Sequence, residues 1–324
     1  MERKNTATLI WWETVGWHEG LTVVRGVVLF ALISAAGLRA SPEDRALAYL
    51  AKEVPAWRRE NGCFSCHNNG DAARALYLAV RLGRRVDPAA LHETTAWLRR
   101  PSQWENNRGD PRFSDKELAR LQFAAGLAAA RDAGAVVAKQ ALEEAAAAVS
   151  LLQQRDGSWR VQGDEAAGSP VTWGASVATA MAREVLHGAD AVKYRPSTQR
   201  ADSWLRRLPL RMTADAAAVL IALPEREDEG VAFLRSAQSS DGGWGPAAHS
   251  PAEAFDTALA LIGLSRTGTR HDALKTGGRA WLIRNQLESG GWRETTRPSG
   301  GASYAQHVST TAWATIALLL TTPP

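Results

Sequence analysis

The sequence has few of the residues that build β-sheets or disulfide scaffolds. Its 324 residues include two cysteines, three methionines, four tyrosines and six phenylalanines. Two cysteines exclude a small fold held together by several disulfides, and the shortage of tyrosine and phenylalanine disfavours strands. Alanine and leucine, which favour helices, are abundant. The composition therefore predicts an α-helical protein, and the length allows one large domain or two ordinary ones.

A strong excess of one charge is also missing. The 38 basic and 34 acidic residues give a formal charge of +4, with no dense stretch of Lys or Arg. This argues against a nucleic-acid partner. The sequence also lacks a glycine-rich phosphate loop, a serine nucleophile elbow and a His-Glu-x-x-His metal motif. The common signatures of nucleotide-binding proteins, hydrolases and zinc proteases are therefore absent.

The apolar run near the N-terminus is too short to span a bilayer comfortably. It covers residues 26–36, follows Arg25 and precedes Ala40-Ser41. These features suit the apolar region of a signal peptide, with cleavage after Ala40. We therefore expect residues 1–40 to be a signal peptide or an N-terminal membrane anchor. The protein would then be periplasmic or otherwise extracytoplasmic. The alternative is a buried N-terminal helix.

Tryptophan is unusually frequent, with 13 copies, and three of them close a repeated heptapeptide. Residues 153–159, 238–244 and 286–292 all follow the pattern Gln-x-x-(Asp/Ser)-Gly-(Ser/Gly)-Trp. Gly242 and Gly290 are 48 residues apart, and Gly157 precedes Gly242 by 85, nearly two such periods. A degenerate copy of the repeat, at residues 198–223, occupies the longer interval. Gly109 and Gly62 continue the series backwards, so turns are expected near residues 62, 109, 157, 208, 242 and 290.

Each unit is expected to be a helical hairpin. An outer helix ends at the Gln, the glycine allows the chain to reverse, and an inner helix runs back. One hairpin cannot bury its apolar faces alone, so neighbours must stack. We expect the Gln amide to bond backbone at a helix end and the Trp to pack on the neighbouring turn. The predicted fold of residues 41–324 is all-α: an α/α toroid of about six hairpins closed in a ring.

These heptapeptides resemble the QW repeat of the squalene-hopene cyclases and related prenyltransferase-like α/α-toroid proteins. The resemblance implies that a hydrophobic small molecule or a peptide binds in the central cavity. In the cyclases, the middle aspartate of an Asp-x-Asp-Asp-Thr-Ala motif donates the initiating proton. The nearest match here is residues 253–258, where Glu253 matches the first acid, Asp256 matches the last, and Phe255 occupies the middle position. The resemblance therefore implies a protein that does not cyclise, with Asp256 and Glu253 as the remaining catalytic candidates.

Two further features weaken the case for cyclisation. Polycyclisation needs many aromatic faces to stabilise cations, and few aromatic residues are expected on the inner helices: Tyr77, Phe123, Trp173, Phe255 and Trp313. The chain is also about half as long as a full two-domain cyclase, as the resemblance implies.

Three acids fall near the starts of inner helices, where capping and the helix dipole favour them. These are Asp71, Asp215 and Asp256.

Both cysteines lie in one motif, Cys63-Phe64-Ser65-Cys66-His67. The spacing C-x-x-C-H is typical of covalent haem c attachment, with Cys63 and Cys66 as thioether links and His67 as an iron ligand. Such attachment occurs outside the cytoplasm, in agreement with export. A Cys63–Cys66 disulfide or free thiols, and a zinc site with a distant fourth ligand, remain alternatives. Residues 68–71 are expected to form a loop before a helix over residues 72–82.

Three hypotheses about function follow, and the sequence leaves open whether the protein is an enzyme. The first is an exported toroid that binds a hydrophobic or extended ligand and carries one haem c for electron transfer with a redox partner. The second is a terpene cyclase-type enzyme with an atypical acid. The third is a structural or partner-binding scaffold with a Cys63–Cys66 disulfide.

Overall fold

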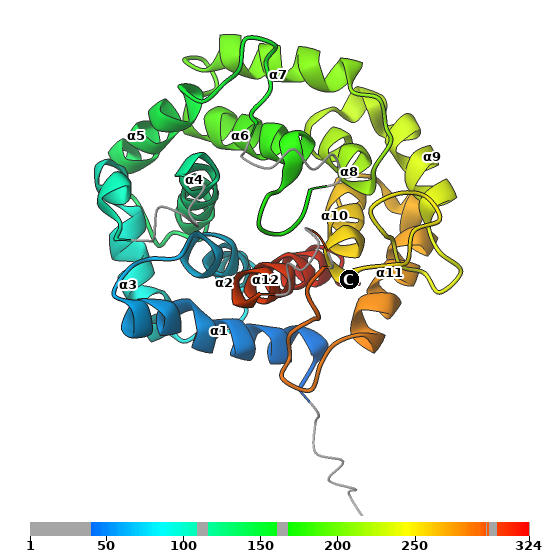
Figure 1. Cartoon of the computed structure of the whole chain (residues 1–324), viewed down its shortest axis with the longest axis horizontal. Helices are drawn as coiled ribbons and strands as arrows, with labels where there is room; N and C mark the ends of the chain where they lie inside the picture. The colour runs from blue at the N-terminus through cyan, green and yellow to red at the C-terminus, as the bar shows by residue number, and fades with distance from the viewer. Residues whose placement is uncertain (1–39, 109–115, 161–167, 296, 298–302, 324) are drawn as a thin grey trace, which may run out of the picture. The chain divides into compact units, whose positions relative to one another are not determined.

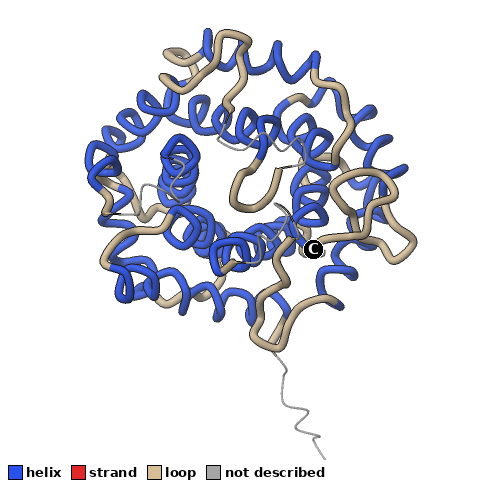
Figure 2. Tube along the Cα trace, viewed as in Figure 1, coloured by secondary structure: helices blue, strands red, loops and turns tan. Residues whose placement is uncertain are grey.

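The computed structural model describes residues 40–108, 116–160, 168–295, 297 and 303–323. Residues 40–324 form one compact unit. Within the described residues the secondary structure is entirely helical, and the helices form two concentric rings (Figures 1 and 2). The predicted all-α toroid is therefore confirmed. The expected signal peptide or anchor, residues 1–40, lies outside the described residues except for Ala40.

Outer and inner helices alternate along the chain. The outer ring consists of α1 (Pro42–Asn61), α3 (Pro88–Leu98), α5 (Lys139–Ser150), α7 (Arg195–Arg207), α9 (Glu227–Ala237) and α11 (Asp272–Arg284). The inner ring consists of the π-helix η1 (Cys66–Ala72) with α2 (Ala73–Arg81), α4 (Lys116–Asp132), α6 (Gly174–Asp190), α8 (Thr213–Ala222), α10 (Ala254–Leu264) and α12 (Tyr304–Leu320). Short 3₁₀ helices lie at η2 (Pro101–Asn106), η3 (Pro224–Arg226) and η4 (Thr269–His271). The six expected hairpins are present.

Two of the inner helices, α8 and α10, are buried along their whole length, because each packs on two inner neighbours and on the outer ring. Small side chains permit this close packing. A Cβ on Gly263 of α10 would lie 3.0 Å from the Cα of Ala217 of α8. The outer helices instead have one apolar face toward the inner ring and one polar face toward solvent.

The three heptapeptides form the same turn. Gly157, Gly242 and Gly290 have φ values of 99°, 94° and 93°, a conformation that favours glycine. In each turn the Gln amide donates to the carbonyl of the turn glycine and to a carbonyl of the next outer helix. For Gln238 these bonds run to Gly242 at 2.8 Å and to Leu274 of α11 at 3.3 Å. The expected tie between neighbouring hairpins is therefore confirmed.

The packing expected of the tryptophans is seen at Trp244, whose ring lies against Gly278 of the next outer helix, α11. The hydrogen bonds of the three indoles run within one hairpin. Each indole N–H donates to a backbone carbonyl ten residues earlier, in its own outer helix, at 2.7–2.8 Å. The bonds run from Trp159 to Val149, from Trp244 to Leu234, and from Trp292 to Leu282. The indole thus satisfies a free carbonyl near the C-terminal end of the outer helix, where helical partners run out. The tryptophan fixes its own hairpin, and the glutamine links it to the next.

The last turn closes the ring onto the first helix. Gln286 donates to the carbonyl of Pro42 at 2.8 Å, repeating the contact seen between other hairpins. Arg279 of α11 bonds Glu43 of α1 at 2.6 Å and the carbonyl of Leu318 of α12 at 2.5 Å. The start of α1 and the end of α12 therefore meet at one guanidinium group.

Two local predictions have other outcomes. The loop expected at residues 68–71 is wrong, because the chain is already helical from Cys66. Ser65 caps this π-helix by accepting from the backbone N–H of His67 at 3.2 Å, so the helical segment begins within the cysteine motif. Gly109, where a turn was expected, lies outside the described residues.

Candidate functional site

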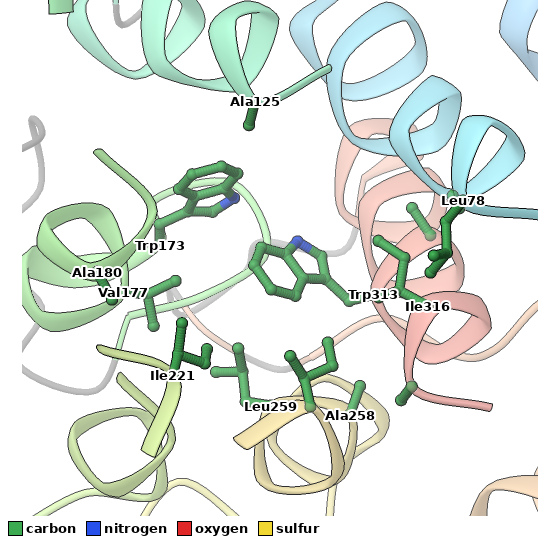
Figure 3. Packing of buried hydrophobic residues seen from close by; sticks show 14 of the residues in the cluster. Leu78, Ala125, Trp173, Val177, Ala180, Ile221, Ala258, Leu259, Trp313 and Ile316 are labelled. Atoms are coloured by element: carbon green, nitrogen blue, oxygen red, sulfur yellow. The ribbon is translucent and has the colours of Figure 1, made fainter. Parts of the chain in front are cut away.

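Three aromatic side chains meet at the centre of the ring and form what we call the aromatic layer: Trp173, Phe255 and Trp313. Trp313 makes edge contacts with Trp173 and Phe255, with ring centroids 5.4 and 5.7 Å apart. Figure 3 shows the two indoles between the surrounding inner helices. Trp173 precedes α6 with a φ of 56°, which is strained for a tryptophan. Tyr77 and Phe123, also expected near the centre, instead contact residues of α3, Thr95 and Trp97.

A cavity of about 460 Å³ lies on one side of the aromatic layer. The C-terminal halves of the inner helices supply its wall, so it sits at the centre of the ring. The aliphatic wall includes Leu78, Ala125, Ala128, Ile221, Ile262 and Ile316. Arg74 and Trp313 line its deep end, since both lie farther from the C-terminal ends of their helices than the residues at the mouth. Its volume is in the range of small-molecule sites.

The mouth of the cavity carries four arginines: Arg81, Arg131, Arg183 and Arg266. Most have acidic partners nearby. Arg131 pairs with Asp132 at 2.6 Å, and Arg266 pairs with Glu184 at 2.7 Å. Arginines near the C-terminal ends of helices are also favoured by the helix dipole. Ion pairs and helix ends therefore account for the charge at the mouth.

Arg74 is different because it is buried at the deep end, with 8% of its surface exposed. Its guanidinium carbon lies 4.1 Å from the ring centroid of Trp313 and 5.6 Å from that of Trp173. Its hydrogen bond in the described structure goes to the sulfur of Met181, at 3.9 Å. Burial lowers the pKa of Arg74, and the negative charges of Asp71 and Glu184 oppose this effect. Trp313, from the aromatic layer, and Arg74 together form the floor of the cavity.

A polar network lies beside this floor. The carboxylate of Asp71 accepts hydrogen bonds from Gln122 at 2.8 Å and from the hydroxyl of Ser309 at 2.9 Å. Ser309 also contacts Nδ1 of His67 at 3.0 Å. Burial raises the pKa of Asp71 to about 6, although Arg74 and the hydrogen bonds act in the opposite direction. Asp71 therefore links three inner-ring segments, and the capping role expected for it is wrong.

The two catalytic candidates lie together, but neither lines the cavity. Arg297 joins them, bonding Glu253 at 3.0 Å and both carboxylate oxygens of Asp256 at 3.0 and 3.2 Å. Burial raises the pKa of Asp256 to about 7, opposed by Arg297 and assisted by Glu253. Phe255, between them in sequence, belongs to the aromatic layer. The position of the cyclase acid is therefore occupied by a buried hydrocarbon ring.

Asp215 has the structural role predicted for it. Its carboxylate accepts from the backbone N–H groups of Met212 at 3.0 Å and Arg211 at 3.2 Å, at the start of α8. Burial raises its pKa, and these hydrogen bonds lower it. An acid that caps a helix in this way is satisfied by its own backbone.

The cysteine motif occupies the turn of the first hairpin. Cys63 is buried and accepts from the indole N–H of Trp57 at 3.3 Å, whereas Cys66 is partly exposed. The structure shows no disulfide between them. Phe64 stacks on Trp97 at 4.5 Å, and Asn107 bonds both backbone groups of Phe64. Neighbouring residues therefore hold the motif in place.

His67 has a defined hydrogen-bond direction. The single hydroxyl proton of Ser309 goes to Asp71, so Nδ1 of His67 must donate to Ser309. This leaves the lone pair of Nε2 free to bind a metal, the arrangement usual for histidine ligands. Burial lowers the pKa of His67 to about 4. The ring is therefore neutral at neutral pH, as a ligand must be.

The described residues contain neither a cluster of metal-ligating side chains nor a helix suited to span a membrane. No group of three or more His, Cys, Asp or Glu side chains in this part of the chain is placed to hold a metal ion. The zinc alternative for Cys63, Cys66 and His67 therefore has no support there. No described helix is both long and apolar enough to cross a membrane.

Comparison with known proteins relates the ring to terpene cyclases. No protein-family model matches the chain. A squalene–hopene cyclase from Zymomonas mobilis is 34% identical over an alignment of 131 residues, and the match covers 34% of this chain and 20% of that protein. The chain thus matches only about a fifth of the length of this curated relative.

Solved structures extend the comparison to most of the chain. A protein from Actinoplanes has a TM-score of 0.57 at 17% identity, covering 87% of this chain and 100% of that one. The apo type II terpene cyclase MstE from Scytonema has a TM-score of 0.53 at 16% identity, covering 86% and 97%. The fold is the α/α toroid of the terpene cyclases. An ent-copalyl diphosphate synthase from Streptomyces platensis has a TM-score of 0.50 at 19% identity, covering 78% of this chain and 50% of that one.

The comparison with MstE bears on length. Because the toroid matches 97% of that chain, a protein of about this size holds a complete fold of this type. The length of the chain is therefore weak evidence against cyclisation. The residues at the centre of the ring are stronger evidence.

Proposed function

We propose that this protein binds an apolar small molecule in its central cavity and does not cyclise it. The observation that carries the proposal is the 460 Å³ cavity, whose aliphatic wall comes from the inner helices. Burying an apolar ligand there removes hydrocarbon surface from water on all sides. The proteins of like fold support this class of ligand, because a squalene–hopene cyclase is named for an apolar hydrocarbon.

The residues at the centre argue against proton-initiated cyclisation. A donor must lie within hydrogen-bond reach of the group it protonates. Glu253 and Asp256 are held by Arg297 and are absent from the cavity wall, and Phe255 has no acidic proton. Apart from Trp313, the residues that line the cavity are mainly aliphatic or charged, so the wall offers few aromatic faces to stabilise a cation.

A binding experiment tests the first part of the proposal. The full chain is titrated with Nile red, a neutral apolar dye, and its fluorescence is followed. Ala128→Phe places a ring in the cavity and is expected to weaken binding by at least about tenfold. Ala147→Phe makes the same change on an exposed position of α5 and should leave the affinity unchanged. Equal affinity in both variants, or no binding by the wild type, would contradict the proposal.

A product assay tests the second part. The full chain is incubated with squalene and, separately, with geranylgeranyl diphosphate, and the extracts are analysed by mass spectrometry. We expect unchanged substrate. Any cyclised product above a boiled control would favour the alternative, a terpene cyclase-type enzyme with an atypical acid.

We also propose that Cys63, Cys66 and His67 hold one covalent haem c. The specific observation is the hydrogen bond from Nδ1 of His67 to Ser309, which leaves Nε2 available to iron. Both thiols are unlinked, and Cys66 is partly exposed. A bound haem would supply one-electron redox chemistry and would call for a redox partner and an extracytoplasmic location. In this proposal Ser309 orients the ligand ring, and Asp71 anchors Ser309.

Expression of the full chain in a host that matures c-type cytochromes tests the haem proposal. A reduced pyridine haemochrome spectrum that survives acid–acetone extraction, at one haem per chain, is expected. Cys63→Ala/Cys66→Ala should lose the covalent haem, and the fraction in which the wild type appears should be the periplasm. A wild type without covalent haem would leave the ligand-binding proposal standing but remove the redox role. A scaffold function would gain support only if the apolar dye also failed to bind.

A further inference from the structure

Arg74 differs from two arginines of this protein that are only partly buried, Arg297 and Arg279. Arg297 bonds the carbonyl of Gly168 and two carboxylates, and Arg279 bonds a carbonyl and the carboxylate of Glu43. Arg74 is buried, whereas those two are partly exposed, yet in the described residues its guanidinium group bonds only the weakly accepting sulfur of Met181. Asp71 acts on it through charge without a direct ion pair within 4.0 Å. A buried cation with unused donors requires an explanation.

The fold does not supply that explanation. Arg74 lies within the continuous helical segment formed by η1 and α2, away from the helix end that accounts for Arg81. Its contacts with the rings of Trp173 and Trp313 stabilise the positive charge but use none of its N–H donors. Arg74 is one of the residues that line the cavity, so a molecule bound there lies beside its guanidinium group.

We propose that the ligand is an amphiphile that enters head first, with a carboxylate bound to Arg74 and an alkyl or isoprenoid chain along the aliphatic wall. This inference rests on the proposed function, since it names the class of ligand for the same cavity. A carboxylate matches the forked donors of a guanidinium group and would complete its hydrogen bonds. Leu78, Ile221 and Ile316 then cover the chain, and the ion pairs at the mouth meet solvent.

A matched pair of ligands tests the inference in the wild-type protein. Dodecanoic acid and dodecanol have the same chain and differ at the head. Each is used at pH 7.5 to displace Nile red from the full chain. Because a hydrogen bond to a charged group in a buried site is strong, the acid should bind about 10- to 100-fold more tightly than the alcohol. Equal binding would overturn the inference and leave the apolar-ligand proposal intact, whereas no binding of either would overturn both.

Variants assign the preference to Arg74. Arg74→Gln keeps much of the side-chain length and should abolish the preference for the acid, while the affinity for dodecanol changes little. Arg74→Lys keeps the charge without the fork and should retain part of the preference. Circular dichroism confirms the fold of each variant, and Arg74→Lys decides the matter if Arg74→Gln does not fold. Arg235→Gln, at an exposed position of α9 outside the cavity, is the control and should behave as wild type. Arg81→Gln tests the mouth of the cavity instead. Loss of the preference in Arg81→Gln but not in the Arg74 variants would place the acid at the mouth and contradict the inference.

Discussion

Two buried aspartates beside the ring centre have opposite kinds of partner. Asp71 is held by neutral donors, Gln122 and Ser309, whereas Asp256 is held by the guanidinium group of Arg297. Burial nevertheless raises the pKa of both, to about 6 and about 7. The loss of water around a carboxylate therefore outweighs the nearby charge in each case. These residues are more readily protonated in the folded chain than in the unfolded one.

This difference predicts a pH dependence of stability. Asp256 ionises near pH 4 when unfolded and near pH 7 when folded. Between these values the folded state binds more protons, so the contribution of Asp256 to the free energy of unfolding falls as the pH rises. Urea unfolding of the wild type and Asp256→Asn should show this at pH 4.5 and 7.5. The wild type should lose stability relative to the variant at the higher pH.

Asp156→Asn provides the control for this measurement. Hydrogen bonds from Ser158 lower the pKa of Asp156, so that carboxylate is ionised in both states between pH 4.5 and 7.5. The difference between the wild type and Asp156→Asn should therefore stay constant over the same range. A constant difference for Asp256→Asn as well would show that its carboxyl ionises normally in the folded chain.

At the scale of the element, each repeated turn depends on a glycine for two separate reasons. Gly290 has a φ of 93°, and a Cβ at this position would collide with the backbone carbonyl of Arg45 in α1. Gly134, between α4 and α5, has a φ of 73° but open space around it. A comparison of the same substitution at the two glycines separates the energetic cost of backbone strain from the cost of a steric clash.

The comparison gives a prediction for the free energy of unfolding. Gly134→Ala should cost about 1–2 kcal/mol, the strain of a left-handed non-glycine residue. Gly290→Ala should cost at least about 2 kcal/mol more, because the turn and α1 must also move apart. Urea denaturation of both variants measures the difference. Equal losses would mean that the turn adjusts to a side chain without disturbing α1.

The elements also show what the sequence could predict. The heptapeptides identified the hairpins because each repeats a local requirement: a glycine with positive φ and a glutamine that reaches the next helix. The replacement of the expected middle acid by Phe255 could be recognised, because its neighbours lie in one short motif, residues 253–258. Arg74 and Trp173 could not, since they meet across about 100 residues and carry no motif. The hydrogen bonds of Trp159, Trp244 and Trp292 were not predicted, because the sequence does not show where a carbonyl is left free.

At the scale of the whole molecule, the ring is closed by contacts between its two ends. Gln286 bonds Pro42 just as Gln238 bonds Leu274, but no loop joins α12 to α1. Loss of the Gln238 contact leaves α9, α10 and α11 covalently connected. Loss of the Gln286 contact leaves α1 attached at one end only.

Hydrogen exchange distinguishes the Gln238 contact from the Gln286 contact. Gln286→Ala and Gln238→Ala should each reduce stability by about 1–3 kcal/mol, since each removes buried amide hydrogen bonds. Only Gln286→Ala should selectively speed the exchange of backbone amides in α1, because that helix can then open locally. Mass spectrometry of peptides from α1 and α9 measures the rates. Unchanged exchange in α1 would show that Arg279 and Glu43 hold the junction without the glutamine.

The meeting of Glu43 and Leu318 at Arg279 has a consequence for biosynthesis. Among the described helices α1 leaves the ribosome first, but the partners that cover one of its flanks, α11 and α12, follow all the others. A growing chain therefore stays an open arc with an uncovered apolar edge until α12 has emerged. A ribosome that stalls within the last hairpin would leave a nascent protein prone to aggregate or to bind chaperones.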